Sequence, residues 1–239
     1  MSVERFIDPL KPTYTEAIVE HPERYEEKTL KSTALLCIDL QYLDAAPGHG
    51  VFADATSSGV PEDAQRYYFD RLERIALPNV RKLQECFRGR GLEVIHVRIQ
   101  SLTRDGRDRS AGHKRLNLLA PPGSKEAEFL ERVAPVGDEI VLNKTASGVF
   151  SSTNLYYVLN NLEINSLYVV GVYTDECVST TVRDACDLGF FVTLVEDACA
   201  TVTPQLHEFT VATLKDRYTR VIDTETAIAE IIGAIRAVG

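Results

Sequence analysis

Long apolar runs are missing from this sequence. No stretch approaches the ~18–20 consecutive apolar residues that a membrane-spanning helix needs. Residues 1–30 are rich in charged side chains and lack the apolar middle of a secretory signal peptide. We therefore predict a cytoplasmic protein that has no membrane partner.

Positive charge is also scarce. The chain carries 26 Lys and Arg against 35 Asp and Glu, which gives a formal net charge of −9. An acidic surface repels phosphate backbones, so nucleic acid is not an expected partner. A small-molecule substrate is the expected ligand.

Cysteine motifs that hold metals or form disulfide frameworks are absent. The five cysteines include no C-x-x-C and no zinc spacing, so free thiols are expected. A buried thiol usually acts as a small apolar side chain, and we expect this of Cys37, Cys86 and Cys186. Cys199, which follows a strand, is expected either in the core or in a loop. Cys177 needs a separate explanation.

The sequence does contain a regular alternation of apolar runs and amphipathic segments. Runs that are apolar at every position are typical of parallel strands buried on both faces, with helices as crossovers. We predict an α/β fold in three layers, α/β/α. It forms one domain over 1–239, with 1–30 as an N-terminal extension that packs on the domain or on a neighbouring subunit. The strands are expected at 33–40, 92–100, 138–144, 166–173, 190–197 and 220–224.

Helices are expected between these strands. Pro78 marks a helix start or a kink, and the helix at 151–162 is expected to begin with a serine cap. Two stretches, 42–68 and 101–124, are expected to be irregular, and long loops of this kind serve as lids, binding loops or interfaces. The helices are expected at 72–91, 151–162, 174–189, 204–218 and 226–238.

Polar residues mark the ends of three predicted strands. In open parallel sheets, ligands bind beyond the carboxyl ends of the strands. Asp39 ends the first strand, Lys144 ends the third, and Cys177 lies just after the fourth. Taken singly, Asp39 fits a helix cap or a loop hydrogen bond equally well, and Lys144 fits a solvated strand end. Their occurrence together predicts a catalytic site.

Cys177 lies in the first turn of the helix expected at 174–189. Backbone N–H groups there have no partner within the helix, and the helix dipole is positive. These effects and a nearby lysine favour a thiolate, and the same N–H groups can hold an oxyanion. Asp175 and Glu176 are adjacent carboxylates, but neighbours along a helix do not face each other, so we expect them to point elsewhere.

The run VVGVYTDECVSTTVRDACDLGFFVTLVEDACAT at 169–201 resembles the signature of the isochorismatase-like cysteine hydrolases. ALLCIDLQ at 34–41 is similar to the aspartate strand of that superfamily, and IVLNKTASGVFSSTNL at 140–155 is similar to its lysine segment. The superfamily includes nicotinamidases, N-carbamoylsarcosine amidase, ureidoacrylate amidohydrolase and biuret hydrolase.

The resemblance implies a six-stranded parallel sheet in the order 3-2-1-4-5-6, with Asp39, Lys144 and Cys177 as catalytic residues. It also implies a cis peptide bond between Val172 and Tyr173, which aims the Tyr173 N–H, beside that of Cys177, at an oxyanion. Relatives form dimers and tetramers, so a homodimer or homotetramer is expected.

Two departures from the patterns of this superfamily narrow the function. Metal-using nicotinamidases carry an aspartate and histidines after the first strand and in the following loops. Here DLQYLDAAPGHG offers only His49, so we predict no catalytic metal and no cofactor. Isochorismatases of phenazine pathways, which cleave a vinyl ether, lack the nucleophilic cysteine. Cys177 therefore indicates the amide-cleaving branch.

We predict a cysteine-dependent amidohydrolase that cleaves a C–N bond in a small amide, ureide or carbamoyl compound through a thioester. Gln41 is expected to orient Asp39 or to touch substrate. Basic side chains in 101–118 either bind a carboxylate or ureido group or solvate the surface. The alternatives are a vinyl-ether hydrolase, a non-catalytic binding member of the fold, and a redox sensor at Cys177. Aromatic residues that either wall the pocket or pack in the core are Tyr42, Phe52, Tyr67, Tyr68 and Phe150.

Overall fold

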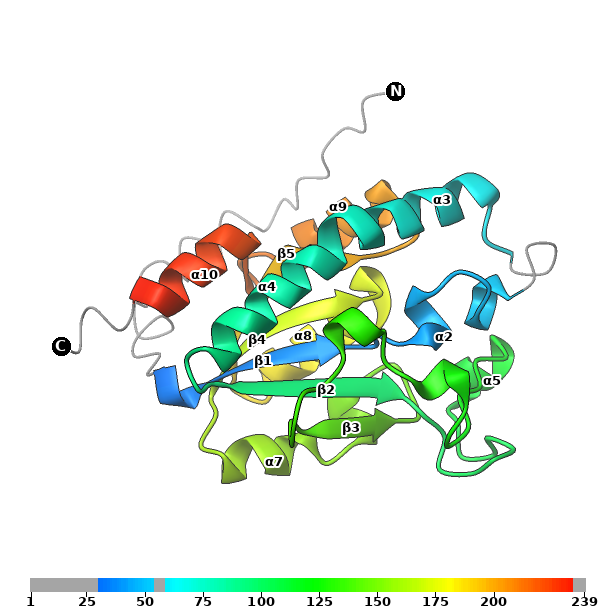
Figure 1. Ribbon diagram of the computed structural model, residues 1–239, viewed down its shortest axis with the longest axis horizontal. Coiled ribbons are helices and arrows are strands. Elements are labelled where there is room, and N and C mark those ends of the chain that lie inside the picture. Colours follow the sequence, from blue (N-terminus) through cyan, green and yellow to red (C-terminus); the bar gives the residue numbers. More distant parts are fainter. Residues whose placement is uncertain (1–29, 54–58, 234–239) are drawn as a thin grey trace.

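The computed structural model describes residues 30–53 and 59–233, and its centre is one sheet of six parallel strands (Figure 1). The strand order is β3-β2-β1-β4-β5-β6, so β1 and β4 are the central neighbours. This confirms the predicted α/β fold and the predicted strand order. The strands are β1 (Thr33–Ile38), β2 (Glu93–Ile99), β3 (Val141–Lys144), β4 (Ser166–Val172), β5 (Phe191–Ala200) and β6 (Arg220–Ile222).

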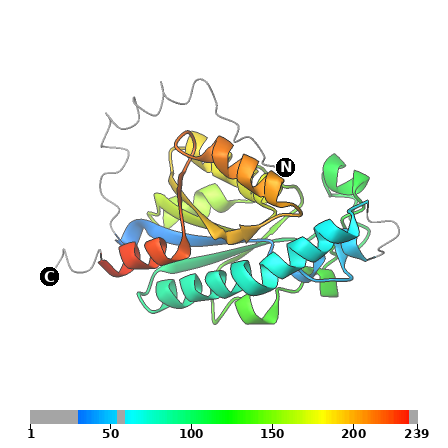
Figure 2. The same ribbon diagram turned by 90° about the horizontal axis from the view of Figure 1, so that it is seen from above.

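Helices cover both faces of the sheet (Figure 2). One face packs on α3, α4 and α10, and the other on α6, α7, α8 and α9. The helices are α2 (Tyr42–Ala45), α3 (Glu62–Arg71), α4 (Leu77–Arg88), α5 (Ala111–Arg115), α6 (Val149–Ser152), α7 (Leu155–Asn161), α8 (Ser179–Asp187), α9 (Pro204–Leu214) and α10 (Thr224–Gly233). Short 3₁₀ turns lie at Leu30–Ser32, Gly50–Phe52, Lys125–Ala127 and Glu131–Val133, and π-helical turns at Leu72–Ala76 and Thr174–Val178.

Strand β1 shows why its sequence is apolar at every position. Leu35 and Cys37 belong to the core under α4, whereas Ala34, Leu36 and Ile38 belong to the core on the opposite face. Successive side chains of a strand point to opposite faces, so a strand covered on both sides needs apolar residues throughout. The parallel strands end at one edge of the sheet, where α2 and α5 lie (Figure 1).

The helix predicted at 72–91 begins well before residue 72. α3, the π-helical turn at Leu72–Ala76 and α4 follow one another without a break. The prediction of an irregular stretch at 42–68 is therefore wrong for Tyr42–Ala45 and for residues 62–68, which belong to α2 and α3. Its charged and small residues mask a helix that buries only one narrow face, of which Tyr68 is the buried member.

Pro78 lies in the first turn of α4, directly after the π-helical turn. Proline lacks an N–H, and its ring crowds the carbonyl one turn earlier. In the π-helical turn, the N–H of Leu77 bonds to the carbonyl of Leu72, five residues back. This wider turn lets the helix continue through the proline.

The single helix predicted at 151–162 is instead two short helices. Thr153 is extended and separates α6 from α7. Its hydroxyl donates to Val149 O at 2.9 Å and accepts from Leu155 N at 3.1 Å. The hydroxyl of Ser152 donates to Gly148 O at 2.6 Å instead of capping a helix. Such local side-chain bonds compete with the helical ladder.

Two of the thiols predicted for the core are only half-buried, namely Cys86 and Cys186, whereas Cys37 and Cys199 are fully buried. Each half-buried thiol lies on a helix at the boundary between core and solvent. The predicted N-terminal extension, except for Leu30, lies outside the described residues, and the single-domain assignment stays a prediction.

Candidate active site

The ends of three strands bring Asp39, Lys144 and Cys177 into contact. Lys144 Nζ lies 2.9 Å from Asp39 Oδ2 and 3.2 Å from Cys177 Sγ. The exposed fraction is 1% for Asp39, 0% for Lys144 and 3% for Cys177, so water does not screen these interactions. Residues placed at separate strand ends by the sequence therefore form one buried cluster.

Asp39 occupies an unusual backbone position at the end of β1. Its φ is 53°, in the left-handed region, and its N–H donates to Val97 O at 2.9 Å. Aspartate is one of the few non-glycine residues that tolerate this region. Backbone positions of this kind cluster at functional sites. The turn leads the chain out of the sheet and into α2.

Lys144 is a buried cation held between two acidic groups. Burial lowers its pKa, but the charges of Asp39 and Cys177 outweigh burial, so the pKa of Lys144 is raised. Its ammonium also donates to Ala146 O at 3.1 Å. Burial raises the pKa of Asp39, while the charge of Lys144 opposes that rise. The lysine thus keeps its proton and provides the positive charge of the cluster.

Cys177 lies in the π-helical turn that precedes α8. The sequence predicted that the helix start and Lys144 would favour a thiolate. Burial instead raises the pKa of Cys177 well above its usual value, although Lys144 opposes the rise. The resting sulfur therefore carries a proton, and a base must remove that proton for attack. Asp39 contacts the same lysine as this thiol, so it is placed to accept the proton.

The carboxylates beside Cys177 have other surroundings. Asp175 Oδ1 accepts a 2.5 Å hydrogen bond from the hydroxyl of Thr201 at the end of β5. Glu176 is exposed. The prediction that neither carboxylate would direct its side chain at Cys177 agrees with the Asp175 contact.

Tyr173 joins β4 to the turn that carries Cys177. The peptide bond between Val172 and Tyr173 is cis, as the family resemblance implied. The side chain is buried, and its hydroxyl donates to the backbone oxygen of Asp44 at 3.1 Å. The oxyanion role of the Tyr173 and Cys177 N–H groups stays a prediction.

Gln41 is fully buried, and its amide bonds to backbone on two segments. Nε2 donates to Ile99 O at 2.9 Å and to Glu126 O at 2.8 Å. Oε1 accepts from Ile99 N at 2.6 Å. The side chain therefore ties the end of β2 to the turn after Asp39. This arrangement supports the first of the two predicted roles, orientation of Asp39, while substrate contact stays a prediction.

The predicted aromatic wall is divided among several places. Phe52 and Tyr68 stack in the core, with ring centroids 5.5 Å apart. Phe150 stacks on Phe190 at 5.7 Å, against the core on the opposite face of the sheet. Tyr42 lies beneath the ammonium of Lys125, which is 3.8 Å from the ring centroid. A pocket-lining role of Phe150 stays a prediction.

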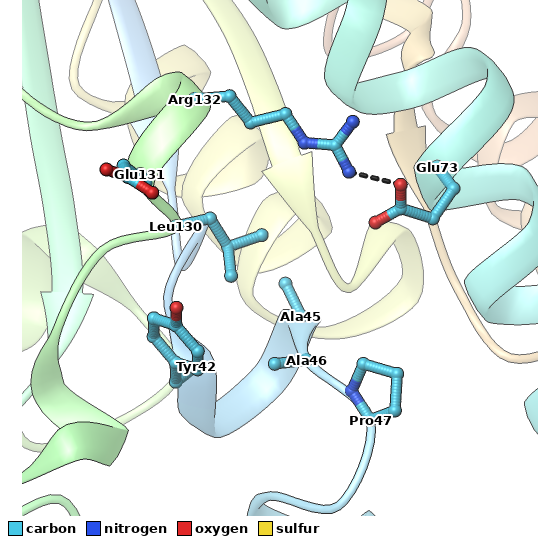
Figure 3. A pocket seen from close by; sticks show the side chains of 8 residues that line it. All are labelled: Tyr42, Ala45, Ala46, Pro47, Glu73, Leu130, Glu131 and Arg132. Carbon is cyan, nitrogen blue, oxygen red and sulfur yellow. Dashed lines mark hydrogen bonds and ion pairs between the residues drawn. The ribbon is translucent and has the colours of Figure 1, made fainter.

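A pocket of about 440 Å³ lies beside α2, and Figure 3 shows the side chains that line it. An ion pair between Arg132 and Glu73 spans one side, and Leu130 faces the pocket from the 3₁₀ turn region (Figure 3). The three clustered residues Asp39, Lys144 and Cys177 do not line it. Its remaining lining residues are Tyr42, Ala45, Ala46, Pro47 and Glu131.

Hydrogen bonds to backbone carbonyl oxygens fix part of the basic segment at 101–118. Arg109 donates to Gly106 O at 2.9 Å and to Leu118 O at 2.6 Å. The N–H of Ser110 donates to Thr145 O at 2.8 Å, which ties the segment to the residue after Lys144. A substrate-binding role of these basic groups stays a prediction.

Asp44 is a buried acid that the sequence analysis missed. It is 2% exposed, and burial raises its pKa well above the usual value, with the charge of Asp39 as the second cause. The only signal in the sequence was an aspartate inside the otherwise apolar run LDAA (43–46), which follows the first strand.

A second missed group is the buried imidazole of His207 on α9. Its Nδ1 lies 2.9 Å from Thr174 Oγ1, and its Nε2 lies 3.0 Å from an Arg71 nitrogen. Because arginine only donates, Nε2 accepts, and Nδ1 carries the proton that it donates to Thr174. This network fixes the start of the turn that carries Cys177.

Among the described residues, no group of three or more His, Cys, Asp and Glu side chains is arranged to hold a metal ion. Within the same part of the chain, no helix combines the length and the apolar character that crossing a membrane requires. The predictions of no metal and no cofactor stay predictions.

Comparison with known proteins gives the following matches. The isochorismatase domain model matches residues 33–226. N-carbamoylsarcosine amidase from Arthrobacter sp. is 26% identical over 160 residues, which are 64% of this chain and 60% of that protein. Ureidoacrylate amidohydrolase from Rhizobium rhizogenes is 25% identical over 195 residues, which are 74% of each protein.

A solved structure agrees with the fold. The crystal structure of a cysteine hydrolase from Pseudomonas syringae pv. phaseolicola matches with a TM-score of 0.69 and 22% identity, and the match covers 86% of this chain and 95% of that one. At this identity the likeness is one of fold.

Proposed function

This chain belongs to the isochorismatase family of hydrolases, and on that premise we propose that it is a cysteine-dependent amidohydrolase. The proposed substrate is a small amide, ureide or carbamoyl compound, and Cys177 is the proposed nucleophile. The observation that carries the proposal is the contact of Lys144 with both Asp39 and Cys177, at 2.9 Å and 3.2 Å, in a buried cluster.

The proposed reaction begins with proton transfer from Cys177 to Asp39. The thiolate attacks the carbonyl carbon, and the oxyanion is held by the backbone N–H groups of Tyr173 and Cys177. Asp39 then gives the proton to the leaving amine or ammonia. Water, deprotonated by Asp39, hydrolyses the thioester and restores the thiol.

The raised pKa of Asp39 supports its proposed role as the proton carrier. A base whose pKa is close to the working pH both accepts and returns a proton readily. Burial moves the pKa of Asp39 in that direction, while Lys144 limits the rise. The raised pKa of Lys144 keeps its ammonium protonated, so Lys144 does not exchange protons itself. We therefore assign it an electrostatic role.

Two relatives support the choice of a C–N bond. Their names describe an amidase of N-carbamoylsarcosine and an amidohydrolase of ureidoacrylate. Vinyl-ether hydrolysis remains the second candidate because the family model carries the isochorismatase name. The buried thiol in contact with a lysine favours the amidohydrolase, because vinyl-ether cleavage needs no nucleophilic cysteine.

The proposal is tested by ammonia release from a panel of small amides and ureides: nicotinamide, ureidoacrylate, biuret, N-carbamoylsarcosine and a lactam. We expect turnover of at least one, and a loss of at least about 10³-fold in Cys177→Ala and Cys177→Ser. Cys86→Ser, which changes a half-buried thiol on α4, is the matched control and should keep full activity.

Iodoacetamide separates the candidate functions. An amidohydrolase should be inactivated by alkylation at Cys177, and its substrate should protect it. A vinyl-ether hydrolase should release pyruvate from isochorismate and keep that activity after alkylation. A binding protein without turnover should release neither product. Full turnover by Cys177→Ala on the best substrate of the panel would reject covalent catalysis.

A further inference from the structure

We propose that Asp44 is a specificity-determining residue that binds an N–H on the acyl side of the scissile carbonyl, so that the preferred substrates are ureides (R–NH–CO–NH₂) rather than simple amides (R–CH₂–CO–NH₂). This inference rests on the proposed function, because it assumes that Cys177 attacks the carbonyl carbon. It concerns a residue to which the proposed reaction gives no role.

The geometry of Asp44 points to a ligand. Its side chain is 2% exposed, and among the described residues its Oδ2 has no hydrogen-bond partner. A buried carboxyl oxygen without a partner is costly, so each such group needs an explanation. A substrate N–H supplies the missing partner of Oδ2.

The position of Asp44 places this oxygen at the proposed reaction centre. α2 begins directly after the turn that carries Asp39, and the charge of Asp44 acts on Asp39, Lys144 and Cys177 alike. It acts on Tyr173 as well, whose N–H is the proposed oxyanion donor.

Two hydrogen bonds from outside α2 fix the backbone of Asp44. Its carbonyl oxygen accepts the hydroxyl of Tyr68 at 2.7 Å and the hydroxyl of Tyr173 at 3.1 Å. Tyr68 lies on α3 and Tyr173 follows β4, so two distant segments hold this one residue. A specificity residue has to be positioned in this way by rigid neighbours.

The charges around Asp44 favour a neutral N–H group over a cation. Asp39, Glu176 and Lys144 are the charged groups that act on it, and Lys144 already neutralises Asp39. Burial and the nearby carboxylates raise the pKa of Asp44, which disfavours its charged form. An uncharged carboxyl has one donor and one acceptor in a plane. The acyl-side N–H of a ureide can donate to the acceptor oxygen of this carboxyl, whereas the methylene of a simple amide has no N–H to donate.

The test uses two substrate pairs in which NH is replaced by CH₂ at constant size. The pairs are N-carbamoylglycine with succinamic acid, and propylurea with pentanamide. Ammonia release gives kcat/KM for each compound with wild type, Asp44→Asn and Asp44→Leu. Cys177→Ala is run alongside on all four compounds.

We expect wild type to prefer the ureide of each pair by at least about tenfold, since a site built to bind an N–H rejects the analogue that lacks it. Asp44→Leu should reduce that ratio to about threefold or less, because the loss of kcat/KM falls mainly on the ureides. Asp44→Asn keeps an acceptor of the same shape and should keep an intermediate ratio. Both variants should fold and melt no lower than wild type, since they remove an unpartnered carboxyl.

The inference is overturned by a wild-type ratio near one, by an absence of ureide hydrolysis, or by an unchanged ratio in Asp44→Leu. An Asp44→Leu protein that fails to fold would show a structural role and would also overturn it. These results leave the proposed function intact as long as amide hydrolysis requires Cys177. Hydrolysis that persists in Cys177→Ala would instead overturn the proposed function.

Discussion

Replacement of Lys144 by methionine removes the one cation of the buried cluster while keeping the length of the side chain. The ammonium contacts Asp39 at 2.9 Å and Cys177 at 3.2 Å. Without it, Asp39 is a carboxylate with no compensating charge in a site that is 1% exposed. Lys144→Met should therefore lower both stability and activity.

The size of each effect follows from the distances. At an effective dielectric constant of about 20, the unit charges of Lys144 and Asp39, 2.9 Å apart, attract by ~6 kcal/mol. Removal of one partner of a buried ion pair costs ~3–5 kcal/mol of folding free energy, because the other charge is left unpaired. That loss is tolerable, since domains have ~5–15 kcal/mol of stability. Asp39 will escape part of the cost by binding a proton.

A double-mutant cycle isolates the ion pair. Urea denaturation of wild type, Lys144→Met, Asp39→Asn and the double variant gives four free energies of unfolding. Because the double variant contains no unpaired charge, we expect it to be more stable than the sum of the single losses by ~2–4 kcal/mol. Additivity within about 0.5 kcal/mol would refute the account of Lys144 as the partner of Asp39.

Lys144→Met should also shift the pH dependence of kcat/KM to higher pH. A positive charge lowers the pKa of a neighbouring acid, so loss of Lys144 raises the pKa of Asp39 and of Cys177. The acidic limb of the kcat/KM profile, which reports Asp39 as base, should move to higher pH in Lys144→Met. Lys144→Arg, which keeps the charge but alters its position, is the matched control and should keep the limb near its wild-type place with a lower rate.

Two further predictions concern stability. The pKa of Asp44 is raised in the folded state, so the folded chain binds more protons than the unfolded chain above pH ~4, and stability falls as pH rises through the raised value. Asp44→Asn should therefore raise Tm more at pH 8 than at pH 5, and an equal gain at both would contradict the assigned shift. Gln41→Leu leaves the N–H and carbonyl of Ile99 and the carbonyl of Glu126 without partners, so it should cost ~2–4 kcal/mol in urea denaturation. A cost under about 0.5 kcal/mol would show that water replaces these bonds.

The sequence was informative where one local feature decides the outcome. Apolar runs at every position predicted buried parallel strands, and β1 shows both of its faces in contact with core. Strand ends predicted the meeting of Asp39, Lys144 and Cys177, because parallel strands end at one edge. The strand order and the cis bond before Tyr173 came from family resemblance, which supplies what periodicity does not.

The sequence was uninformative where the outcome depends on three-dimensional burial. The pKa of Cys177 is raised because the thiol is enclosed, whereas the helix start and Lys144 predicted the opposite shift. Asp44 looked like an ordinary loop aspartate, since nothing local reveals that its oxygen is enclosed. The helix through Pro78 was placed too late because the charged and small residues of α3 bury only one narrow face.

The most direct test of the central claim is mass spectrometry of an acyl-enzyme trapped by acid during turnover. With the best substrate of the ammonia-release panel, the account predicts a mass increase equal to the acyl group, located on the peptide that contains Cys177 and absent in Cys177→Ser. An acyl group found on another residue, or full turnover by Cys177→Ala, would contradict it.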